Sequence, residues 1–455
     1  MPPQAQPAKR RESMNLAGRT ARAKLGRTRK SAASMASPPT STSGLPRLKI
    51  TDVRVIVTCP DRNYVLVKIL TSEPGLYGVG DATLNGRELA VATTLEKHLA
   101  PLLIGRDPEA IEDIWQYLYR GTYWRGGPVQ MTALAGVDLA LWDIKGKRAG
   151  MPVYQLLGGR TRAGALAYTH AAGNNLTEVE DAVRRAMERG FKCVRAQVAI
   201  PGLEGTYGTS EKKTSEEIAG RVPQQADLPH TELFEPGPYL RIVPKLFAHL
   251  RATLGEEVEL IHDVHEKLGP VEAARLAKEL EPYHLFFLED PLRPEYKESF
   301  RLIRRHSTTP LAMGELFNTL WDCVDLIKEQ LIDFIRCDLG HIGGITHARK
   351  IAALAEAFQV KTAWHGPADV GPPTHAANVH VDISIPNFGI QEMVFFPEVT
   401  REVMPGAPEF QNGTMMVRDT PGLGTDVNEA LARKYPYKRA YLPTARRGDG
   451  SVHDW

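Results

Sequence analysis

Three acidic residues, Asp263, Glu289 and Glu315, each end a short apolar segment of the sequence. The segments read ELIHD, LFFLE and LAMGE, and their spacing is even, because 289 − 263 and 315 − 289 both equal 26. That interval accommodates one strand, one helix and two short loops. A single acid in such a place would suit a helix cap or a solvated loop. Three evenly spaced carboxylates would repel one another, and a bound cation relieves that repulsion. An all-oxygen set favours Mg²⁺ over zinc.

The alternation of side chains along a strand sorts the neighbours of these acids. Glu289 can point inward, so Asp290 should face the helix layer or a loop. By the same rule Asp263 and His265 share one face of their strand, and His262 lies on the other. A zinc hydrolase that used His262, His265 and Glu289 is therefore disfavoured.

The elements that must position the acids alternate between strands and amphipathic helices after about residue 161. Two of the helical segments read PVEAARLAKELEP and ITHARKIAALAEAF. Eight parallel strands separated by helices specify a closed barrel, whose catalytic groups collect at the C-terminal ends of the strands. The fold class predicted is α/β, a modified (β/α)8 TIM-type barrel over residues 161–399. The eight strand candidates are GALAYTHA, FKCVRAQV, VELIHDVH, LFFLED, PLAMGE, IDFIRCD, VKTAWHG and FGIQEM.

Residues 47–160 form a different pattern, in which strands come first and helices follow. Two strands with turn residues between them predict an antiparallel meander, and three helical segments come after it. This order indicates a separate α+β domain. Residues 400–455 return to mixed loops and the segment NEALARKYPYK, and we expect them to pack back on this first domain.

Composition excludes several classes of protein. No window contains the roughly 18 uncharged apolar residues that a membrane span needs. The four cysteines lie far apart and form no CxxC pair, so we expect neither disulfides nor a cysteine zinc site, and a reducing cytoplasm fits. Residues 1–46 contain nine Lys or Arg and one acid, a net charge of +8, which leaves 2 − 8 = −6 for the rest. A nucleic-acid partner is therefore not expected for the remainder of the chain.

The basic segment 1–46 has almost nothing to bury, and we predict that it is disordered. Three alternatives could explain this segment: a targeting peptide, a nucleic-acid arm, or upstream sequence that precedes a later start at Met14 or Met35. We favour the last of these, or an extension without function. A second unusual segment runs from Ala199 to Pro238. Its 40 residues are rich in Gly, Pro, Ser and charge, which is typical of a lid over an active site.

Seven stretches from Leu48 to Trp455 resemble the mannonate dehydratase subgroup of the enolase superfamily, which includes starvation-sensing proteins. The resemblance implies an enolase-like capping domain over the barrel, one Mg²⁺ ion, and dehydration of D-mannonate to 2-keto-3-deoxy-D-gluconate. The stretches are GDATLNGRE, AIEDIWQYLYRGTYWRGGP, ALAGVDLALWDIKGKRAGMPVYQLLGG, RAQVAIPG, HDVHEKLGPVEAARLAKELEPYHLFFLEDP, MGELFN and NFGIQE.

The resemblance also implies roles for individual residues. Asp263, Glu289 and Glu315 would be the metal ligands. Many enolase relatives have a lysine base on the second strand, whereas VRAQV offers Arg195 and Gln197. Arginine keeps its proton at neutral pH and is a poor base. In the mannonate dehydratase pattern a loop tyrosine, here Tyr207, takes the C2 proton, and the guanidinium of Arg195 would lower the pKa of its phenol. His265 would then protonate the departing 3-hydroxyl.

Further residues match substrate contacts of the subgroup, and each also has a purely structural alternative. Arg336 suits a carboxylate or a ligand rich in hydroxyls, because its guanidinium donates two parallel hydrogen bonds. It could equally pair with a structural acid, and Trp455 could be a hydrophobic anchor instead of closing the pocket. The matched residues are Asn85, His170, Arg336, His365, Glu392 and Trp455.

Two features leave the substrate open. Asp338 and His365 end consecutive strands and could form the His-Asp base of other branches of the superfamily. Pro367 lies where members of the subgroup vary, and some act slowly or prefer D-gluconate. We therefore keep D-gluconate or another aldonate, with low activity, as an alternative. A non-catalytic regulatory protein that binds a sugar acid is the rival of another class. The partner expected is a small aldonic acid, with no nucleic acid and no membrane, and the chain should form a homo-oligomer.

Overall fold

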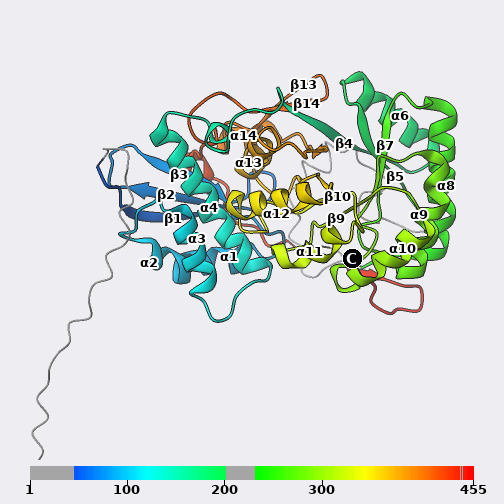
Figure 1. The fold of residues 1–455 in the computed structure, drawn as a ribbon, viewed down its shortest axis with the longest axis horizontal. Coiled ribbons are helices and arrows are strands. Elements are labelled where there is room, and N and C mark those ends of the chain that lie inside the picture. The colour runs from blue at the N-terminus through cyan, green and yellow to red at the C-terminus, as the bar shows by residue number, and fades with distance from the viewer. Residues whose placement is uncertain (1–45, 201–230, 441, 443, 455) are drawn as a thin grey trace, which may run out of the picture. The chain divides into compact units, whose positions relative to one another are not determined.

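The computed structural model describes residues 46–200, 231–440, 442 and 444–454. All of them belong to one compact unit. Figure 1 shows its two main parts, a small antiparallel sheet with its helices and a ring of strands with helices outside it. The basic segment at the start of the sequence, Tyr207 and Trp455 lie outside the described residues.

The second part of the described chain is a closed parallel barrel, so the predicted fold class is confirmed. Its strands are hydrogen-bonded in chain order from β4 to β11. The ring closes where β12 pairs with β4 and where Thr362 bridges to Phe388. Each predicted strand segment contains one observed strand. The strands are β4 (Ala165–Gly173), β5 (Cys193–Val198), β7 (Glu259–Asp263), β8 (Phe287–Glu289), β9 (Leu311–Met313), β10 (Phe334–Ile335), β11 (Lys361–Thr362) and β12 (Gln391–Glu392).

Helices cover the outside of this ring, as Figure 1 shows for α8, α9 and α10. Helices such as α6, α9 and α12 are amphipathic, and their buried faces carry Val, Leu, Ile and Ala that pack in the core. The barrel helices are α6 (Leu176–Glu188), α8 (Pro236–Leu254), α9 (Pro270–Leu280), α10 (Phe300–His306), α11 (Leu320–Lys328), α12 (Ile345–Ala357) and α13 (Pro372–Asp382), with short 3-10 turns η2 (Glu281–Tyr283) and η3 (Pro294–Ser299).

The interior of the barrel is filled by a layer with one residue from each strand or its end. The layer mixes large and small side chains, which is how eight strands fill a closed interior. All eight residues are buried, and they form a cluster separate from the main core. They are Tyr168, Cys193, Ile261, Phe287, Ala312, Phe334, Ala363 and Ile390.

The capping part begins with the antiparallel sheet β1 (Ile50–Thr58), β2 (Tyr64–Thr71) and β3 (Tyr77–Asp81), one strand more than the two predicted. Helix α4 lies directly on β3 because Gly78 and Gly80 have no side chain. A Cβ at either glycine would come within 2.0 Å of a carbonyl oxygen of α4. The helical elements are α1 (Glu88–Thr93), the π-helix η1 (Thr94–Leu99), α2 (Ala100–Leu103), α3 (Ile111–Arg120), α4 (Pro128–Ala149) and α5 (Val153–Leu156).

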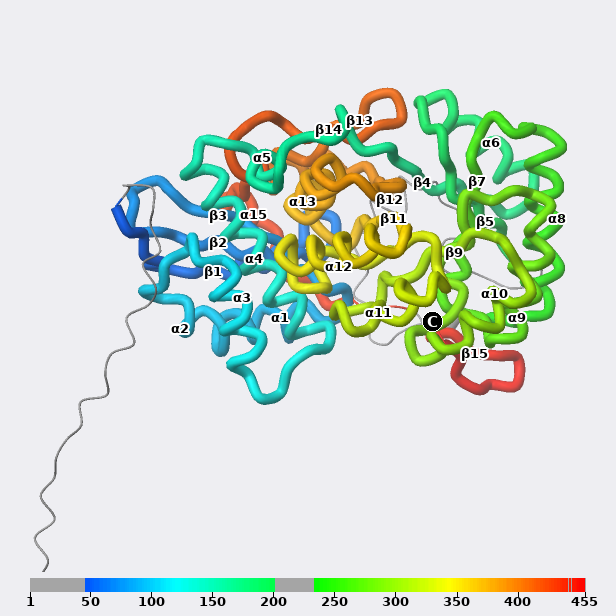
Figure 2. The backbone as a smooth tube through the Cα atoms, viewed as in Figure 1, coloured from blue at the N-terminus to red at the C-terminus, as the bar shows by residue number. Residues whose placement is uncertain are grey.

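The C-terminal segment contacts both parts. Helix α15 (Glu429–Ala432) lies near β1, and the amide of Cys59 donates to the carbonyl of Tyr435. Strand β15 (Thr444–Arg446) then pairs in parallel with β6 (Thr231–Leu233) beside the barrel. Figure 2 follows this path from α15 to β15. The segment between β12 and α15 contains α14 (Glu398–Val403), β13 (Glu409–Gln411) and β14 (Thr414–Met416). Strand β14 pairs with β4.

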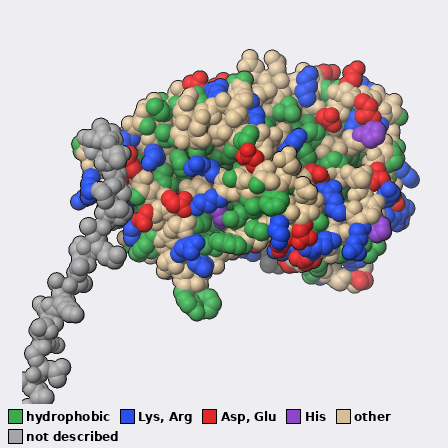
Figure 3. Space-filling model, viewed as in Figure 1, with side chains coloured by type: hydrophobic (Ala, Val, Ile, Leu, Met, Phe, Trp, Pro, Cys, Tyr) green, Lys and Arg blue, Asp and Glu red, His purple; other side chains and the backbone are tan. Residues whose placement is uncertain are grey.

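Two surface properties bear on the partners of the protein. On the face seen in Figure 3, basic and acidic side chains are interspersed among the described residues. Tyr123 and Trp124, in the loop before α4, are 90% and 84% exposed. Among the described residues, no helix combines the length and the apolar content that crossing a bilayer requires.

A buried carboxylate couples the capping part to the barrel. Asp138 of α4 accepts a hydrogen bond from the amide of Thr346, 3.0 Å away, in the first turn of α12. Trp142, one turn further along α4, donates its indole N–H to the hydroxyl of Thr346 over 2.9 Å. Asp138 thus satisfies a free amide at the start of a helix from another part of the fold. Burial raises the pKa of Asp138 to about 7, although the hydrogen bonds from Thr346 oppose this.

We predict that Asp138→Asn changes the pH dependence of stability. The unfolded state loses the Asp138 proton near pH 4 and the folded state near pH 7, so wild-type stability falls as the pH rises between these values. Relative to the variant, the free energy of unfolding should fall by about 4 kcal/mol over that range. Urea unfolding from pH 4 to 8 measures it. Asp113→Asn, on the exposed side of α3, is the matched control, and equal pH profiles for all three proteins would contradict the coupling.

Candidate active site

A ring of polar side chains lies next to the buried interior layer, two residues further toward the C-terminal end of each strand. Adding two to the number of each interior residue gives a residue on the same face of the same strand, or of its continuation. Seven of these positions are residues that the sequence singled out, and the eighth is a glycine. The eight are His170, Arg195, Asp263, Glu289, Gly314, Arg336, His365 and Glu392.

Gly314 is the exception that lets a glutamate reach the ring from the next position. Its φ of 143° is unfavourable for a side chain, and a Cβ there would lie 3.0 Å from the amide nitrogen of Cys337. Glu315 therefore enters the site from the turn after β9, two residues beyond the strand, whereas Asp263 and Glu289 end their strands. The sequence predicted that all three acids end strands, and for Glu315 this is wrong.

The three predicted metal ligands meet through two buried guanidinium groups. Nη1 of Arg195 lies 2.8 Å from an oxygen of Asp263 and 2.8 Å from an oxygen of Glu289. Arg336 lies 2.7 Å from Glu289 through Nη2 and 2.7 Å from Glu315 through Nη1. Burial raises the pKa of Glu289 to about 7, against the opposing effect of Arg336. Burial would also raise the pKa of Asp263, but Arg195 and His265 outweigh burial and lower this pKa.

Asp290 belongs to the same site, contrary to the prediction that it faces the helix layer or a loop. It is fully buried, and its Oδ2 lies 3.0 Å from Nη1 of Arg336. Its backbone has a φ of 40°, which breaks the alternation of the strand and turns the side chain toward the site. Oxygens of Asp263, Glu289 and Asp290 lie within 4.8 Å of one another, which is close enough to share an ion.

The pair that the sequence left open, Asp338 and His365, is formed. Nδ1 of His365 lies 2.8 Å from Oδ2 of Asp338, and its Nε2 lies 3.6 Å from Glu315. Burial alone would lower the pKa of His365. Glu315, Glu392 and the hydrogen bond to Asp338 outweigh burial and raise this pKa to about 9.

His170 and Glu392 complete the ring on the other side. Nε2 of His170 lies 2.7 Å from Oε1 of Glu392, and its Nδ1 lies 3.2 Å from Nη2 of Arg195. Oε2 of Glu392 lies 2.7 Å from Nη2 of Arg336 and accepts the amide of Gly366. These contacts make the ring a continuous network of charge-assisted hydrogen bonds.

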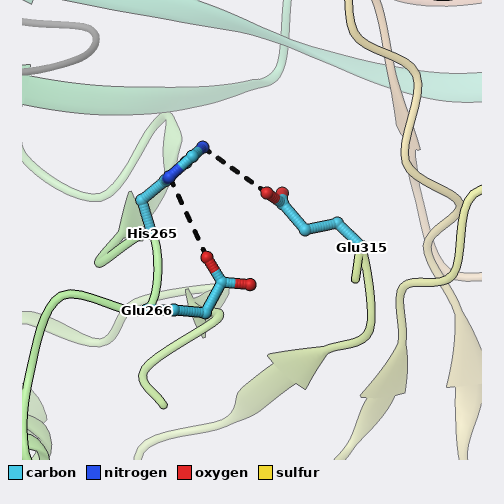
Figure 4. A group of neighbouring side chains, drawn as sticks. All are labelled: His265, Glu266 and Glu315. Atoms are coloured by element: carbon cyan, nitrogen blue, oxygen red, sulfur yellow. Dashed lines mark ion pairs between the residues drawn. The ribbon is translucent and has the colours of Figure 1, made fainter. Parts of the chain in front are cut away.

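His265 lies in the site with Asp263, as their shared parity predicted, although it follows the end of β7. It follows β7 in a turn with a φ of 55°, and Glu266 follows it with a φ of 56°. Figure 4 shows the imidazole of His265 between the carboxylates of Glu266 and Glu315, with Nε2 3.4 Å from Oε1 of Glu315. His262 points away, toward Tyr239 and the carbonyl of Ala196, as expected from its parity.

Asn85 lies outside the ring, in the loop after β3. Its Nδ2 donates to Asp369 of the loop after β11 over 2.8 Å. Tyr168, which the sequence analysis did not single out, places its hydroxyl 3.0 Å from Glu289 and 3.3 Å from Arg336. Its inward parity, two residues before His170, was the available signal. Tyr207 and Trp455 cannot be placed, since both lie outside the described residues.

Comparisons with known proteins identify the family of this chain. Residues 178–431 match the family described as enolase C-terminal domain-like, and residues 48–158 match the N-terminal domain of mandelate racemase and muconate lactonizing enzymes. The chain belongs to the enolase superfamily. A D-mannonate dehydratase of Sphingomonas sp. strain SKA58 is 54% identical over 410 residues, which cover 90% of this chain and all of that protein.

The names of two further relatives mention related sugar acids. A protein of Cellvibrio japonicus called D-galactonate dehydratase family member RspA is 52% identical over 408 residues, 90% of this chain and all of that one. The crystal structure of an enolase from Pantoea ananatis with bound D-gluconate and Mg has a TM-score of 0.83 and 47% identity. It covers 89% of this chain and 99% of that chain.

We predict that Arg336→Met destabilises the fold strongly, because it leaves four buried carboxylates without their shared cation. The expected loss in the free energy of unfolding at pH 7 is about 3–5 kcal/mol. Urea unfolding of the protein in EDTA measures it. Arg418→Met, which removes an exposed pair with Glu409, should change stability by less than about 1 kcal/mol. Equal losses in the two variants would show that Arg336 does not balance the acids.

Proposed function

We propose that this protein is a Mg²⁺-dependent sugar acid dehydratase that converts D-mannonate to 2-keto-3-deoxy-D-gluconate. One observation carries the proposal. Asp263, Glu289 and Glu315 lie at or just beyond the C-terminal ends of three successive strands, where Arg195 and Arg336 join them, with a histidine on each side of Glu315. A cation site flanked by two groups that transfer protons suits removal of a proton next to a carboxylate. The high identity to named D-mannonate dehydratases supports the choice of substrate.

The donor set fits a hard divalent cation. The three acids offer only carboxylate oxygens, all are buried, and Asp290 adds another oxygen within reach. Mg²⁺ prefers oxygen ligands of this kind. When bound, Mg²⁺ would neutralise the negative charge that develops on the substrate as the C2 proton leaves.

The proton transfers are assigned to residues of this chain. We propose that Tyr207 takes the C2 proton and that His265 donates a proton to the 3-hydroxyl, which leaves as water while the C3–O bond breaks. The enol that results tautomerises to the 2-keto acid. Arg195 would favour the phenolate of Tyr207, although its charge is already shared with Asp263 and Glu289. His365, paired with Asp338, is the alternative base.

Substrate recognition is proposed for the rim of the ring. His170 and His365 are partly exposed, so they can contact a hydroxyl-rich acid, and Asn85, Glu392 and Trp455 are proposed to help. Arg336 is fully buried, and both of its Nη atoms contact carboxylates. This geometry supports the alternative that Arg336 holds the acids in place.

A second candidate function is dehydration of D-gluconate with low activity. The neighbour from Pantoea ananatis contains bound D-gluconate, and the buried Pro367 lies beside His365 at a position expected to vary with substrate. We also propose a homo-oligomer and a cytoplasmic location. The four cysteines are free and buried, which suits a reducing compartment.

A panel of aldonic acids tests the function directly. Purified protein with Mg²⁺ should convert D-mannonate, and more slowly D-gluconate, to a 2-keto-3-deoxy acid, measured by a colorimetric assay for that product. EDTA should abolish conversion, and added Mg²⁺ should restore it. If every acid of the panel stays unchanged while binding is still detected by calorimetry, the non-catalytic binding protein replaces the enzyme.

The identity of the base is tested by isotope exchange. We predict that Tyr207→Phe abolishes exchange of the C2 proton with solvent deuterium, followed by NMR, while Mg²⁺ stays bound. His365→Asn should retain exchange and weaken substrate binding, because it leaves the phenol in place. Normal exchange in Tyr207→Phe together with its loss in His365→Asn would move the role of base to the pair of Asp338 and His365.

A further inference from the structure

Glu266 is a buried acid that the proposed reaction does not use. Its side chain is 99% buried, and both of its carboxylate oxygens lack a hydrogen-bond partner among the described residues. A buried carboxylate without partners costs several kcal/mol. Its surroundings include a second acid, Glu315, and the groups of opposite charge that act on it are the imidazole of His265, 3.9 Å away, and the guanidinium of Arg293. The site therefore favours a positive ligand at this carboxylate.

The backbone holds Glu266 in this unfavourable place. His265 and Glu266 are two successive residues with positive φ, 55° and 56°, and neither is glycine. Such a conformation costs roughly 1–2 kcal/mol per residue. A strained backbone of this kind persists where surrounding contacts fix it. Here the strained turn directs the side chains of His265 and Glu266 toward Glu315.

Three donors converge around one point. One ligand atom each of His265, Glu266 and Glu315 lie within 4.8 Å of one another, and all three residues are buried. Nδ1 of His265 lies 3.9 Å from Oε2 of Glu266, and its Nε2 lies 3.4 Å from Oε1 of Glu315. Two ligands of a tetrahedral zinc ion are about 3.3 Å apart. The two contacts use opposite nitrogens of the imidazole, so one ring nitrogen would be the ligand and side-chain rotation would bring both carboxylates to the same ion.

Glu315 can serve this cluster and also the three-carboxylate set, which is the set of proposed Mg²⁺ ligands Asp263, Glu289 and Glu315. Its Oε1 faces His265, whereas its Oε2 faces Arg336 and His365. A carboxylate with its two oxygens directed to opposite sides can bridge two cations, as in two-metal sites. The two ligand sets differ in chemistry, because only the cluster with Glu266 contains an imidazole nitrogen. Mg²⁺ prefers oxygen, and Zn²⁺ accepts one nitrogen with two carboxylates.

We propose that His265, Glu266 and Oε1 of Glu315 form a second cation site that binds Zn²⁺ while Mg²⁺ occupies the three-carboxylate set. Zn²⁺ in this site takes His265 as a ligand and so removes the group assigned to protonate the leaving hydroxyl. The site is therefore inhibitory, a consequence that rests on the proposed function. The binding itself does not depend on it.

Zinc titration of the full chain tests the site. Protein is freed of metal, dialysed into saturating Mg²⁺ and titrated with Zn²⁺ by calorimetry, with both metals measured after desalting. The wild type should bind one Zn²⁺ per chain and retain Mg²⁺. Glu266→Gln, isosteric with a neutral glutamic acid, should weaken Zn²⁺ binding at least tenfold, and so should His265→Gln. Glu295→Gln, which changes an exposed glutamate outside the cluster, should bind as the wild type.

The outcomes separate this proposal from the dehydratase assignment. X-ray absorption of the zinc form should show one imidazole ligand. Displacement of Mg²⁺ by Zn²⁺ one for one, or unchanged Zn²⁺ binding in both Glu266→Gln and His265→Gln, would overturn the site. If the protein dehydrates an aldonate, half-maximal inhibition should need at least tenfold more Zn²⁺ in Glu266→Gln. A protein that converts no aldonate still gives a complete binding result.

Discussion

The balance of buried charge at the mouth of the barrel is the constraint on which the rest of the structure depends. Five acids meet there, Asp263, Glu289, Asp290, Glu315 and Glu392, against the two guanidiniums of Arg195 and Arg336. If all were ionised, 5 − 2 = 3 negative charges would remain. Burial responds by raising the pKa of Glu289 and Asp290, so that each holds a proton more tightly. A divalent cation would remove most of this excess, which supports the proposal that acids of this group hold Mg²⁺.

Strand alternation accounts for the part of the site that could be predicted. The interior layer of Tyr168, Ile261 and Phe287 is apolar because it must fill a closed barrel. Two residues further on, the same face carries His170, Asp263 and Glu289. The sequence contains this period directly, as apolar segments that end in an acid, so the strands, the fold class, Asp263 and Glu289 were predictable from it. Similar reasoning placed His262 outside the ring, where it contacts Tyr239. The other ring residues that were named from the resemblance to the family are His170, Arg336, His365 and Glu392.

Asp290 and Glu315, the two residues that sequence reasoning misplaced, share one physical cause. Asp290 has a positive φ, and Glu315 follows a glycine with a φ of 143°. Where the backbone leaves the extended conformation, parity no longer tells where a side chain points. The sign of φ at these residues depends on contacts with other strands, such as the amide of Gly314 donating to Asp290 over 2.8 Å. A local pattern carries no record of those contacts.

Glu315 links the metal site to the direction of proton transfer. It lies between two imidazoles, 3.4 Å from His265 and 3.6 Å from His365. Burial lowers the pKa of His265, whereas Glu315, Glu392 and Asp338 together overcome burial at His365 and raise its pKa to about 9. At neutral pH and without a cation, His365 therefore carries the proton, whereas the lowered pKa of His265 disfavours the protonated form that an acid needs. A cation on Glu315 would remove the largest charge that favours protonation of both imidazoles, so it would lower the pKa of each. The protonation of both imidazoles would therefore change when a metal binds at Glu315.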